Sequence, residues 1–356
     1  MESDSSHEQT EILANSVTTL RSRSGHFCSA LSKMKPSSFL SGYPTGIEQA
    51  LQHRAGIGIR ADDLFMYRMP VQVSHECPRA TRHFPLLEPS LRWERVMSIL
   101  DRFNLADRRL FITGGSRGLG KEMALAIADA GAHVILVGRD AESLDRTADQ
   151  IRSLGRQAWP IVGDVGDPSQ CESICNDVVA NHGPIDILIN NVGGRRENIA
   201  TEQMPLEKWK ALIDLNLTST FLCTKIIGGH MIERGTGGKI INIASINALV
   251  ATSGIAGRHY ETAKAGIVQF TRSVAADWAP HGINVNTICP GTFMTEPNVR
   301  WSKLYPDVIN DFKSRIPMGR FGEPEEIGPL AVYLAADASS YMTGAAIVID
   351  GGYTLW

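Results

Sequence analysis

The sequence is poor in the features that mark most specialised classes of protein. Its 356 residues carry a formal net charge of only −3, which gives no general attraction to nucleic acid or to an anionic membrane. The six cysteines form no CxxC pair, which is typical of a reduced, intracellular chain rather than of a disulfide scaffold. No uninterrupted run approaches the roughly eighteen apolar residues that a membrane span needs. We therefore expect a small molecule as the partner, with neither nucleic acid nor membrane involved.

Targeting signals and metal-ligand spacings are also missing. Glu2, Asp4 and Glu8 precede the first lysine or arginine, whereas a secretory signal begins with basic residues and a transit peptide avoids acidic ones. We therefore predict a cytoplasmic protein. Cys171 and Cys175 lie one helical turn apart in an apolar-periodic stretch, and we interpret them as ordinary buried thiols. The sequence accordingly predicts no metal site.

The chain divides into two parts of different character near residue 97. Residues 1–96 show no sustained hydrophobic period and no repeat, and Ser, Arg, His and Pro are mixed with isolated apolar residues. We interpret them as a disordered extension or an over-long reading frame, with an appended regulatory segment as the alternative. From Arg108 onward, short β-branched runs alternate with helical patterns. This alternation predicts βαβ units and a mostly parallel sheet, in one domain over residues 97–356.

A glycine-rich turn opens this second part. The apolar run 109–112 predicts a strand, residues 113–120 read Thr-Gly-Gly-Ser-Arg-Gly-Leu-Gly, and residues 121–128 predict a helix. A strand, a glycine-rich turn and a helix form the context of a dinucleotide site, because backbone N–H groups and the helix N-terminus attract a pyrophosphate. The residues that we assign to the cofactor from this turn are Gly114, Ser116, Arg117, Gly118, Leu119 and Gly120.

The end of the next predicted strand, 133–137, bears on which dinucleotide is bound. An acidic residue about twenty positions after the turn would hold the ribose 2′-hydroxyl of NAD, whereas an arginine would hold the 2′-phosphate of NADP. Position 138 is glycine and Arg139 follows it, so Arg117 and Arg139 can supply two guanidinium groups to a phosphate. We predict NADP as the cofactor. In the alternative, which leaves NAD open, Arg139 is solvated and Asp140 only caps the next helix.

Small or polar residues also end the next two predicted strands. The strand at 159–162 is followed by Gly163, Asp164 and Val165, where a carboxylate and a backbone amide could hold an adenine edge. The strand at 185–189 runs into the sequence Asn-Asn-Val-Gly-Gly at 190–194. Because ligands on open α/β sheets gather at the carboxyl ends of the strands, these two ends extend the predicted cofactor site.

A serine, a tyrosine and a lysine follow in an arrangement typical of proton transfer. The predicted strand 239–244 delivers Ser245 at its carboxyl end, and Tyr260 and Lys264 open a helix further along. A spacing of four places the phenol and the ammonium on one helix face. A phenol with an ordinary pKa near 10 needs a downward shift of about three units to act near neutrality, and Lys⁺ with a positive nicotinamide ring favours the phenolate. Ser245 would hold the carbonyl or alkoxide oxygen.

Taken together, these motifs resemble those of the short-chain dehydrogenase/reductase family. The likeness covers about residues 105–356 and implies a doubly wound, Rossmann-type α/β fold with a mostly parallel seven-stranded sheet and helices on both faces. Val192 departs from the family's usual alanine. The matching residues are the turn at 113–120, Asp164 and Val165, the Asn-Asn-Val-Gly run at 190–193, Ser245, the Tyr-Glu-Thr-Ala-Lys run at 260–264, Pro290, Gly291 and Thr295.

The resemblance also implies further site residues and an assembly. Asn216 would be the fourth catalytic member beside Ser245, Tyr260 and Lys264, and would bind a water that relays protons from Lys264 to bulk solvent. A homotetramer built on the long helices around 206–233 and 260–281 is implied as well. The cofactor-binding residues that it adds to those of the turn and Arg139 are Asp164, Val165, Asn191, Val192, Gly193, Tyr260, Lys264, Pro290, Gly291 and Thr295.

Within the family, the sequence is similar to gluconate 5-dehydrogenases and nearly as similar to 3-oxoacyl-carrier-protein reductases. Arg195, Arg196 and Arg258 lie close in sequence to the predicted reacting centre and suit a substrate carboxylate, which they could bind bidentately. This favours reduction of a sugar acid such as 5-keto-gluconate, with the carrier-protein ketoreductase as the alternative. A catalytically silent NADP-binding regulatory protein is a third interpretation, which the presence of all four catalytic residues disfavours.

Overall fold

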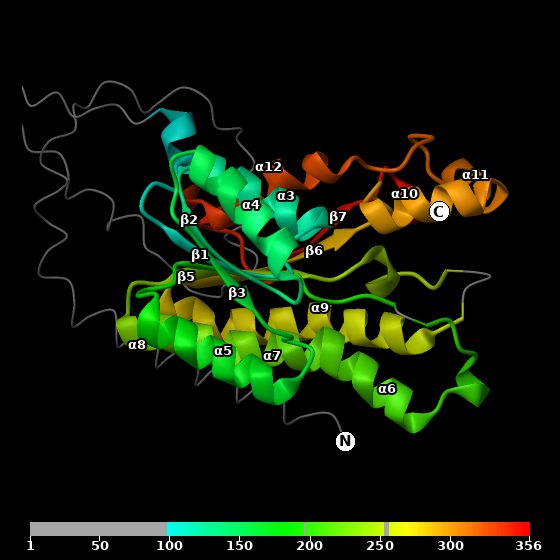
Figure 1. Cartoon of the computed structure of the whole chain (residues 1–356), viewed down its shortest axis with the longest axis horizontal. Helices are drawn as coiled ribbons and strands as arrows, with labels where there is room; N and C mark the ends of the chain where they lie inside the picture. Colours follow the sequence, from blue (N-terminus) through cyan, green and yellow to red (C-terminus); the bar gives the residue numbers. More distant parts are fainter. Residues whose placement is uncertain (1–97, 196, 253–255) are drawn as a thin grey trace, which may run out of the picture. The chain divides into compact units, whose positions relative to one another are not determined.

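The computed structural model of the chain describes residues 98–195, 197–252 and 256–356 (Figure 1). The interpretation of residues 1–96 falls outside these ranges, and so does Arg196. The described part begins with a short helical turn, Ile99–Phe103 (η3), which Ser98 caps by accepting a hydrogen bond from the Leu100 N–H. This turn leads directly into the first strand of the sheet.

Seven strands form one sheet in the order β3-β2-β1-β4-β5-β6-β7, and every pairing is parallel. The predicted seven-stranded, mostly parallel sheet is therefore confirmed. The strand order reverses between β1 and β4, and open α/β sheets bind ligands at such a reversal. The strands are β1 (Arg109–Thr113), β2 (His133–Gly138), β3 (Ala158–Val162), β4 (Ile187–Asn190), β5 (Gly238–Ile243), β6 (Ile283–Pro290) and β7 (Ala346–Ile349).

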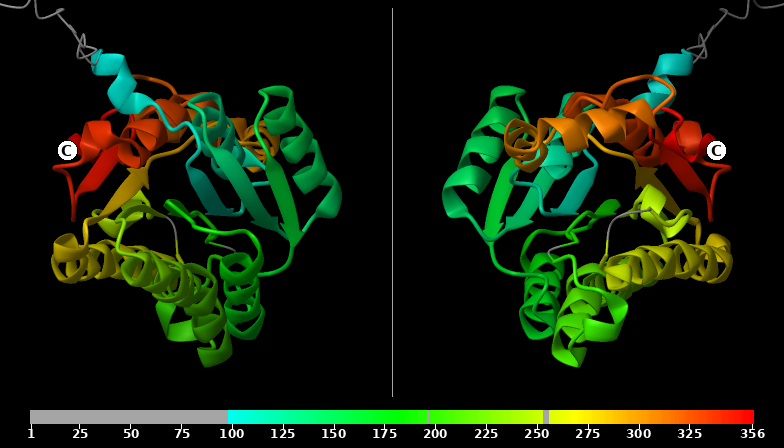
Figure 2. Two further views of the ribbon diagram at one scale, coloured as in Figure 1. Left: turned by 90° about the vertical axis from the view of Figure 1, so that its left-hand side faces the viewer. Right: turned by 90° about the vertical axis from the view of Figure 1, so that its right-hand side faces the viewer.

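Helices cover both faces of this sheet, as the end-on views of Figure 2 show. One face carries α3 (Gly118–Asp129), α4 (Ala141–Ser153) and α12 (Gly328–Ala335). The opposite face carries α5 (Pro168–Asn181), α9 (Arg258–Trp278) and a continuous helical run made of α6 (Leu206–Ile213), α7 (Ser219–Cys223) and α8 (Gly229–Arg234). Two further helices, α10 (Glu296–Leu304) and α11 (Pro306–Ser314), follow β6. The doubly wound Rossmann-type prediction is thus confirmed.

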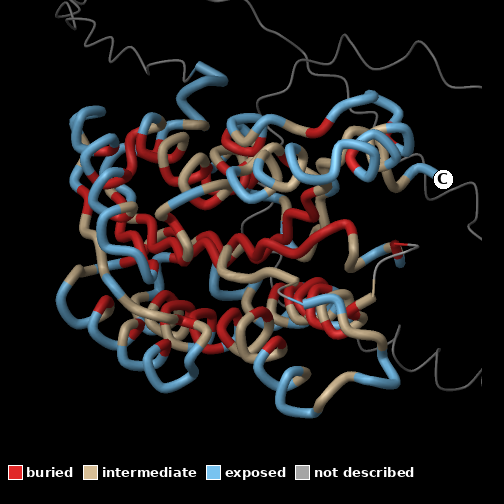
Figure 3. Tube along the Cα trace, turned by 45° about the vertical axis from the view of Figure 1, so that its right-hand side comes forward, coloured by how far each residue is buried: buried red, intermediate tan, exposed pale blue. Residues whose placement is uncertain are grey.

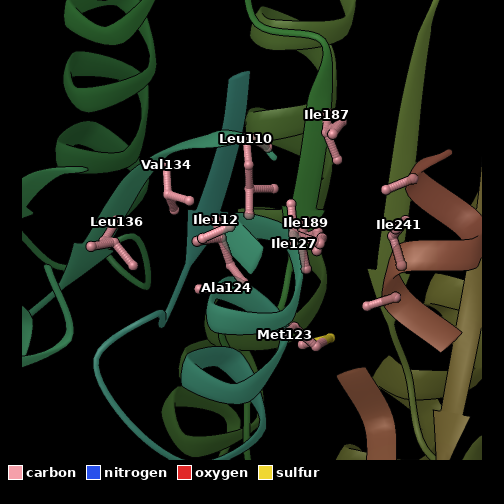
Figure 4. Packing of buried hydrophobic residues seen from close by; sticks show 14 of the residues in the cluster. Leu110, Ile112, Met123, Ala124, Ile127, Val134, Leu136, Ile187, Ile189 and Ile241 are labelled. Atoms are coloured by element: carbon pink, nitrogen blue, oxygen red, sulfur yellow. The ribbon is translucent and has the colours of Figure 1, made fainter. Parts of the chain in front are cut away.

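The core lies on both sides of the sheet, which explains why the strands read as nearly continuous apolar runs. Leu110, Ile112 and Ile189 pack against Met123 and Ile127 of α3, and all five side chains are fully buried (Figure 4). The strands form the buried centre of the tube in Figure 3. Burying one such side chain contributes about 1.5–3 kcal/mol. This stabilisation fixes the strands whose carboxyl ends carry the site.

One helical run among the described residues, Leu206–Arg234, is long and apolar enough to cross a membrane by length and composition alone. Its most apolar eighteen-residue window has a mean hydropathy of 1.2, although polar residues interrupt every long apolar run within it. Half of its most apolar window is buried inside the fold. That burial is what the core helix of a soluble domain shows, because its apolar side faces the sheet.

Cys171 and Cys175 are fully buried on α5, as predicted. The structure adds a third thiol, Cys223 of α7, whose sulphur lies 3.5 Å from that of Cys171 and 3.6 Å from that of Cys175. The three sulphurs lie within 4.8 Å of one another. The sequence could not place Cys223 beside the other two, because the contact joins two helices far apart in the chain. That this cluster holds no metal stays a prediction.

Candidate active site

The glycine-rich turn after β1 has the tight geometry that its sequence predicts. Gly114 has φ +68° and Gly118 has φ +54°, values that favour glycine because a Cβ is strained there. A Cβ added at Gly120 would lie only 2.1 Å from the carbonyl oxygen of Gly114. Helix α3 therefore packs directly on the turn that precedes it. Its N-terminus and the N–H groups of the turn face the carboxyl edge of the sheet, where they favour an anion.

The loop after β4 is tied to this turn across the reversal in strand order. The Asn191 side chain donates hydrogen bonds to the carbonyl oxygens of Thr113 (3.0 Å) and Gly114 (3.1 Å). The backbone N–H groups of Asn191 and Val192 both donate to the Thr113 hydroxyl. Asn191, predicted as a cofactor ligand, thus has its side-chain amide engaged in holding the two loops together.

The end of β2 presents Arg139 and has no acid at position 138. A Cβ added at Gly138 would lie 3.2 Å from the Ser116 hydroxyl, so a side chain at this position would be tightly confined. Arg139 is 55% exposed, and its Nη1 lies 3.4 Å from Oδ2 of Asp164. Asp140 caps α4 by accepting from the Ser143 N–H at 2.8 Å. The capping role considered for Asp140 is present, and Arg139 has a carboxylate partner within the protein.

An open cleft of about 490 Å³ runs along the carboxyl edge of the sheet and brings most of the predicted residues together. Gly118 and Thr295 lie in an adjoining hollow, with Thr295 Cγ2 3.4 Å from a Cβ built on Gly118. The predicted residues that line the cleft are Gly114, Ser116, Arg117, Leu119, Gly120, Arg139, Asp164, Val165, Asn191, Val192, Gly193, Ser245, Tyr260, Lys264, Pro290 and Gly291.

Three chemically competent side chains meet at one end of this cleft. Ser245 follows β5, and its hydroxyl accepts from the Asn247 N–H at 3.1 Å. Tyr260 and Lys264 lie in the first turns of α9, and the Lys264 ammonium is 5.9 Å from the centre of the Tyr260 ring. Lys264 is buried and donates to the Ile243 carbonyl oxygen at 2.7 Å. The strand end and the helix start therefore present a hydroxyl, a phenol and an amine to the same space.

Asn216 lies behind this trio in a π-helical turn, Asp214–Thr218 (η5). Its side chain is fully buried, accepts from the Gly194 N–H at 3.0 Å and donates to the carbonyl oxygens of Gly194 and Leu212. A Cβ added at Gly193 would lie 2.5 Å from Asn216 Oδ1 and 2.9 Å from Lys264 Nζ. Gly193 thus leaves the space in which the amide and the amine approach each other. Such π-turns often occur at functional sites.

Burial, rather than the lysine, dominates the electrostatics of the phenol. Desolvation raises the pKa of Tyr260 above its ordinary value, while the Ser245 hydroxyl and the positive charge of Arg195 oppose this rise. Burial also lowers the pKa of Lys264 to about 8. Because desolvation of the phenol outweighs the effects of Ser245 and Arg195, the protein groups alone raise the pKa of Tyr260. The downward shift expected from Lys⁺ together with a positive nicotinamide ring stays a prediction.

The predicted substrate arginines are engaged with a carboxylate that the sequence analysis did not single out. Both oxygens of Glu261 lie 2.8 Å from Nη1 of Arg258, and one lies 3.6 Å from Nη2 of Arg195. Arg195 also donates to the carbonyl oxygens of Ala256 and Gly257. Arg258 remains 41% exposed, whereas Arg195 is 19% exposed. Glu261 follows Tyr260 directly in the sequence, and this adjacency was the available signal for it.

Other lining residues were missed because they carry no motif. Ser143 of α4 reaches the end of β2 only through the fold, and Leu215 reaches the cleft from the turn that contains Asn216. Asn247, behind the lining residues, donates its backbone N–H to the Ser245 hydroxyl and accepts from that hydroxyl through its side-chain oxygen at 3.4 Å. A polar residue shortly after a strand-end serine is the signal that could have found Asn247.

Comparison with known proteins places the chain in a family. A sequence profile described as Enoyl-(Acyl carrier protein) reductase matches residues 114–354. Gluconate 5-dehydrogenase of Gluconobacter oxydans is 37% identical over 260 residues, which cover 73% of this chain and 99% of that protein. The 3-oxoacyl-[acyl-carrier-protein] reductase of a Synechocystis species is 35% identical, covering 69% of this chain and 96% of that protein.

Two further proteins bear on the cofactor. The NAD-dependent glycerol dehydrogenase of Listeria innocua is 37% identical over 71% of this chain and 96% of its own length. A solved gluconate 5-dehydrogenase from Burkholderia cenocepacia, in complex with NADP and tartrate, is 34% identical, with a TM-score of 0.66 over 73% of this chain and 100% of its own. With the profile match, the parallel sheet and the identity to these relatives, the chain belongs to the short-chain dehydrogenase/reductase family of oxidoreductases acting on CH–OH groups.

Proposed function

We propose that the chain is an NADP(H)-dependent oxidoreductase that interconverts a secondary alcohol and a ketone, with Tyr260 as the general acid and base. One observation carries this proposal. Ser245, Tyr260 and Lys264 line the same cleft as the glycine-rich turn, so that acid–base groups and an anion-binding turn face one space. A silent nucleotide-binding protein has no need of that arrangement.

The residues present fit a nicotinamide dinucleotide. The backbone at Gly114 and Gly118 leaves the turn open to a pyrophosphate, and a side chain at Gly193 would fill the space beside Lys264. Pro290 and Gly291 line the cleft at the end of β6. When bound, the cofactor supplies or accepts the hydride. The acid–base work falls to the protein.

Each catalytic side chain has a distinct role in this proposal. In alcohol oxidation, the Tyr260 phenolate takes the hydroxyl proton of the substrate, and in ketone reduction the phenol returns it. Ser245 donates a hydrogen bond to the reacting oxygen, which stabilises the charge that develops there. Lys264 moves protons on the inner side of the cleft, where Asn216 and the Gly194 carbonyl form the polar wall.

NADP is favoured over NAD by the end of β2. Gly138 offers no carboxylate to a ribose 2′-hydroxyl, and Arg117 and Arg139 both line the cleft there. The structure of the Burkholderia relative contains NADP. The Asp164 partner of Arg139 and the NAD-dependent Listeria relative keep NAD as the alternative cofactor.

A sugar acid is the substrate class that we favour. Arg258, two residues before Tyr260 in the chain, is more exposed than Arg195 and lines a separate pocket with Met204 and Trp209. A bidentate arginine there suits a carboxylate. The Gluconobacter relative is a gluconate 5-dehydrogenase. A 3-oxoacyl-carrier-protein reductase activity is the second candidate, which the Synechocystis relative supports.

A substrate panel tests this function. We expect NADPH-dependent reduction of 5-keto-gluconate to exceed that of acetoacetyl thioesters and of neutral ketones. Tyr260→Phe should lower kcat at least about a hundredfold, the low end of general acid–base contributions, while leaving NADPH binding intact by nucleotide fluorescence. Tyr341→Phe, at a fully exposed tyrosine, is the matched control and should keep the wild-type kcat. Near-normal turnover by Tyr260→Phe would refute the mechanism, and preference for the thioester would shift the substrate to the second candidate.

A further inference from the structure

The Arg195 guanidinium lies over the face of the Tyr260 ring, with its carbon 4.8 Å from the ring centre. This distance is within the roughly 6 Å over which a cation is attracted to an aromatic face. Arg195 comes from the loop after β4 and Tyr260 from α9, so the contact joins this loop to the helix that carries the phenol. The Arg195 side chain is 19% exposed, and the stack is largely shielded from solvent.

Three acceptors hold the guanidinium in this position. Nη1 donates to the carbonyl oxygens of Ala256 at 3.0 Å and Gly257 at 3.3 Å, and Nη2 lies 3.6 Å from the Glu261 carboxylate. Gly257 is the residue that caps the start of α9, immediately before the turn that carries Tyr260. These contacts commit the donors of Arg195 to the protein, and they orient the guanidinium toward the ring.

The other cation beside the phenol is not permanent. Lys264 is buried, and burial lowers the pKa of its ammonium to about 8. Above that pH the amine is largely neutral and gives little support to a phenolate. An arginine stays protonated at any pH at which a protein is stable. The charge of Arg195 therefore persists where that of Lys264 is lost.

We propose that Arg195 is a positioning residue for Tyr260, which fixes the plane of the ring and supplies a permanent positive charge that favours the phenolate. This inference rests on the proposed use of Tyr260 as the acid–base group. It differs from the role that the sequence suggested for Arg195, because the guanidinium acts on the tyrosine and not on a substrate carboxylate.

The remaining charged groups around the phenol leave this effect in place. Burial raises the pKa of Cys289, at the end of β6, to about 11, so its thiol is neutral. Glu261 carries the opposing charge, and it is shared with Arg258, which binds both of its oxygens. Two arginines against one carboxylate leave a net positive charge on this side of Tyr260. Ser245, on the other side, adds a hydroxyl and no charge.

The pH dependence of kcat for alcohol oxidation, at saturating substrate and cofactor, tests the proposal. Oxidation needs the phenolate, so kcat rises with pH through the pKa of Tyr260 in the ternary complex. Arg195→Gln should raise that apparent pKa by about one unit, which lowers kcat about tenfold on the rising limb. Arg195→Lys should restore most of the wild-type profile. Arg152→Gln, at an arginine that pairs with Asp149 on α4, is the control and should leave the apparent pKa unshifted.

Glu261→Gln separates charge from structure. It weakens the hold on Arg195 but removes the negative charge, so a charge effect predicts an apparent pKa equal to or below that of wild type. If the Arg195 contacts had a purely structural role, Arg195→Gln and Glu261→Gln would shift the apparent pKa in the same direction. That result would overturn the proposal. An unshifted profile in Arg195→Gln with a raised KM for carboxylate substrates would also overturn it. Turnover by Tyr260→Phe would instead refute the proposed function, so the two failures are distinguishable.

Discussion

The two ends of the cleft differ in the chemical groups around them, backbone at one end and charged side chains at the other. The phosphate end consists of backbone and glycine: Gly114, Gly118 and Gly120 shape the turn, and the Asn191 amide holds it. Beside the other end, next to Tyr260, lie charged side chains that bind one another, with Glu261 between two arginines. A surface made of backbone keeps its function as long as the chain keeps its path. The function of a surface made of charged side chains depends on which ion pairs form. Substitutions therefore act on the two ends in different ways.

The largest effect that we expect from this contrast is at Arg258. Arg258→Ala removes a cation and also exposes Glu261, which then repels a substrate carboxylate. We expect the KM for keto acids to rise ten- to a hundredfold, the order of one charged hydrogen bond, with little change in kcat. The measurement is steady-state kinetics with 5-keto-gluconate and with a neutral ketone, which should be nearly indifferent.

The double variant Arg258→Ala with Glu261→Ala divides that effect into its two parts. If the unmasked carboxylate causes most of the rise, the double variant should recover much of the lost affinity. If direct binding by Arg258 dominates, the double variant should stay as weak as Arg258→Ala. A KM for keto acids that is unchanged in Arg258→Ala would remove the carboxylate contact from the proposed function.

At the phosphate end, a single methyl group should be enough to disturb the turn. A Cβ at Gly120 would lie 2.1 Å from Gly114 O and 2.4 Å from the Asn191 side-chain nitrogen, so α3 must move away from the turn. We expect Gly120→Ala to destabilise the domain by about 1–3 kcal/mol, a fall in Tm of roughly 2–4 °C for each kcal/mol, and to weaken NADPH binding.

Gly229 provides the matched control for this substitution. It lies in the helical run on the opposite face of the sheet, and a Cβ there meets nothing within 4 Å. Gly229→Ala should leave stability unchanged or raise it by up to about 1 kcal/mol, because alanine favours the helix. Thermal unfolding with and without NADPH measures both variants. Equal melting temperatures for Gly120→Ala and Gly229→Ala would contradict the steric account of the turn.

The same contrast explains how far the sequence alone could lead. Local patterns predict the strands, the turn at 113–120 and the Tyr260–Lys264 helix. Their periodicity and spacing depend only on residues that lie close together in the chain. The pairing of both arginines with Glu261 could not be predicted, since it depends on how the loop after β4 approaches α9. The desolvation of Lys264 was equally inaccessible, because its burial comes from the packing of α9 against β5 and β6. Reasoning from charge alone also left out the desolvation that raises the pKa of Tyr260.

The smallest effect that we expect is at Arg139, a charged side chain at the end built from backbone and glycine. Arg139 extends from a backbone-built strand end, but its guanidinium is 55% exposed and partly neutralised by Asp164. Solvent screening and this competing carboxylate should reduce its contribution, so Arg139→Ala should lower the NADPH-over-NADH ratio of kcat/KM by only about tenfold. Arg152→Ala, at the far end of α4 where the arginine pairs with Asp149, is the control and should leave the ratio unchanged.

Raising the salt concentration should shrink the Arg139 effect further, because exposed charges are screened. An unchanged ratio in Arg139→Ala would assign the 2′-phosphate to Arg117 and the turn, and would make this specificity, too, a property of the phosphate end.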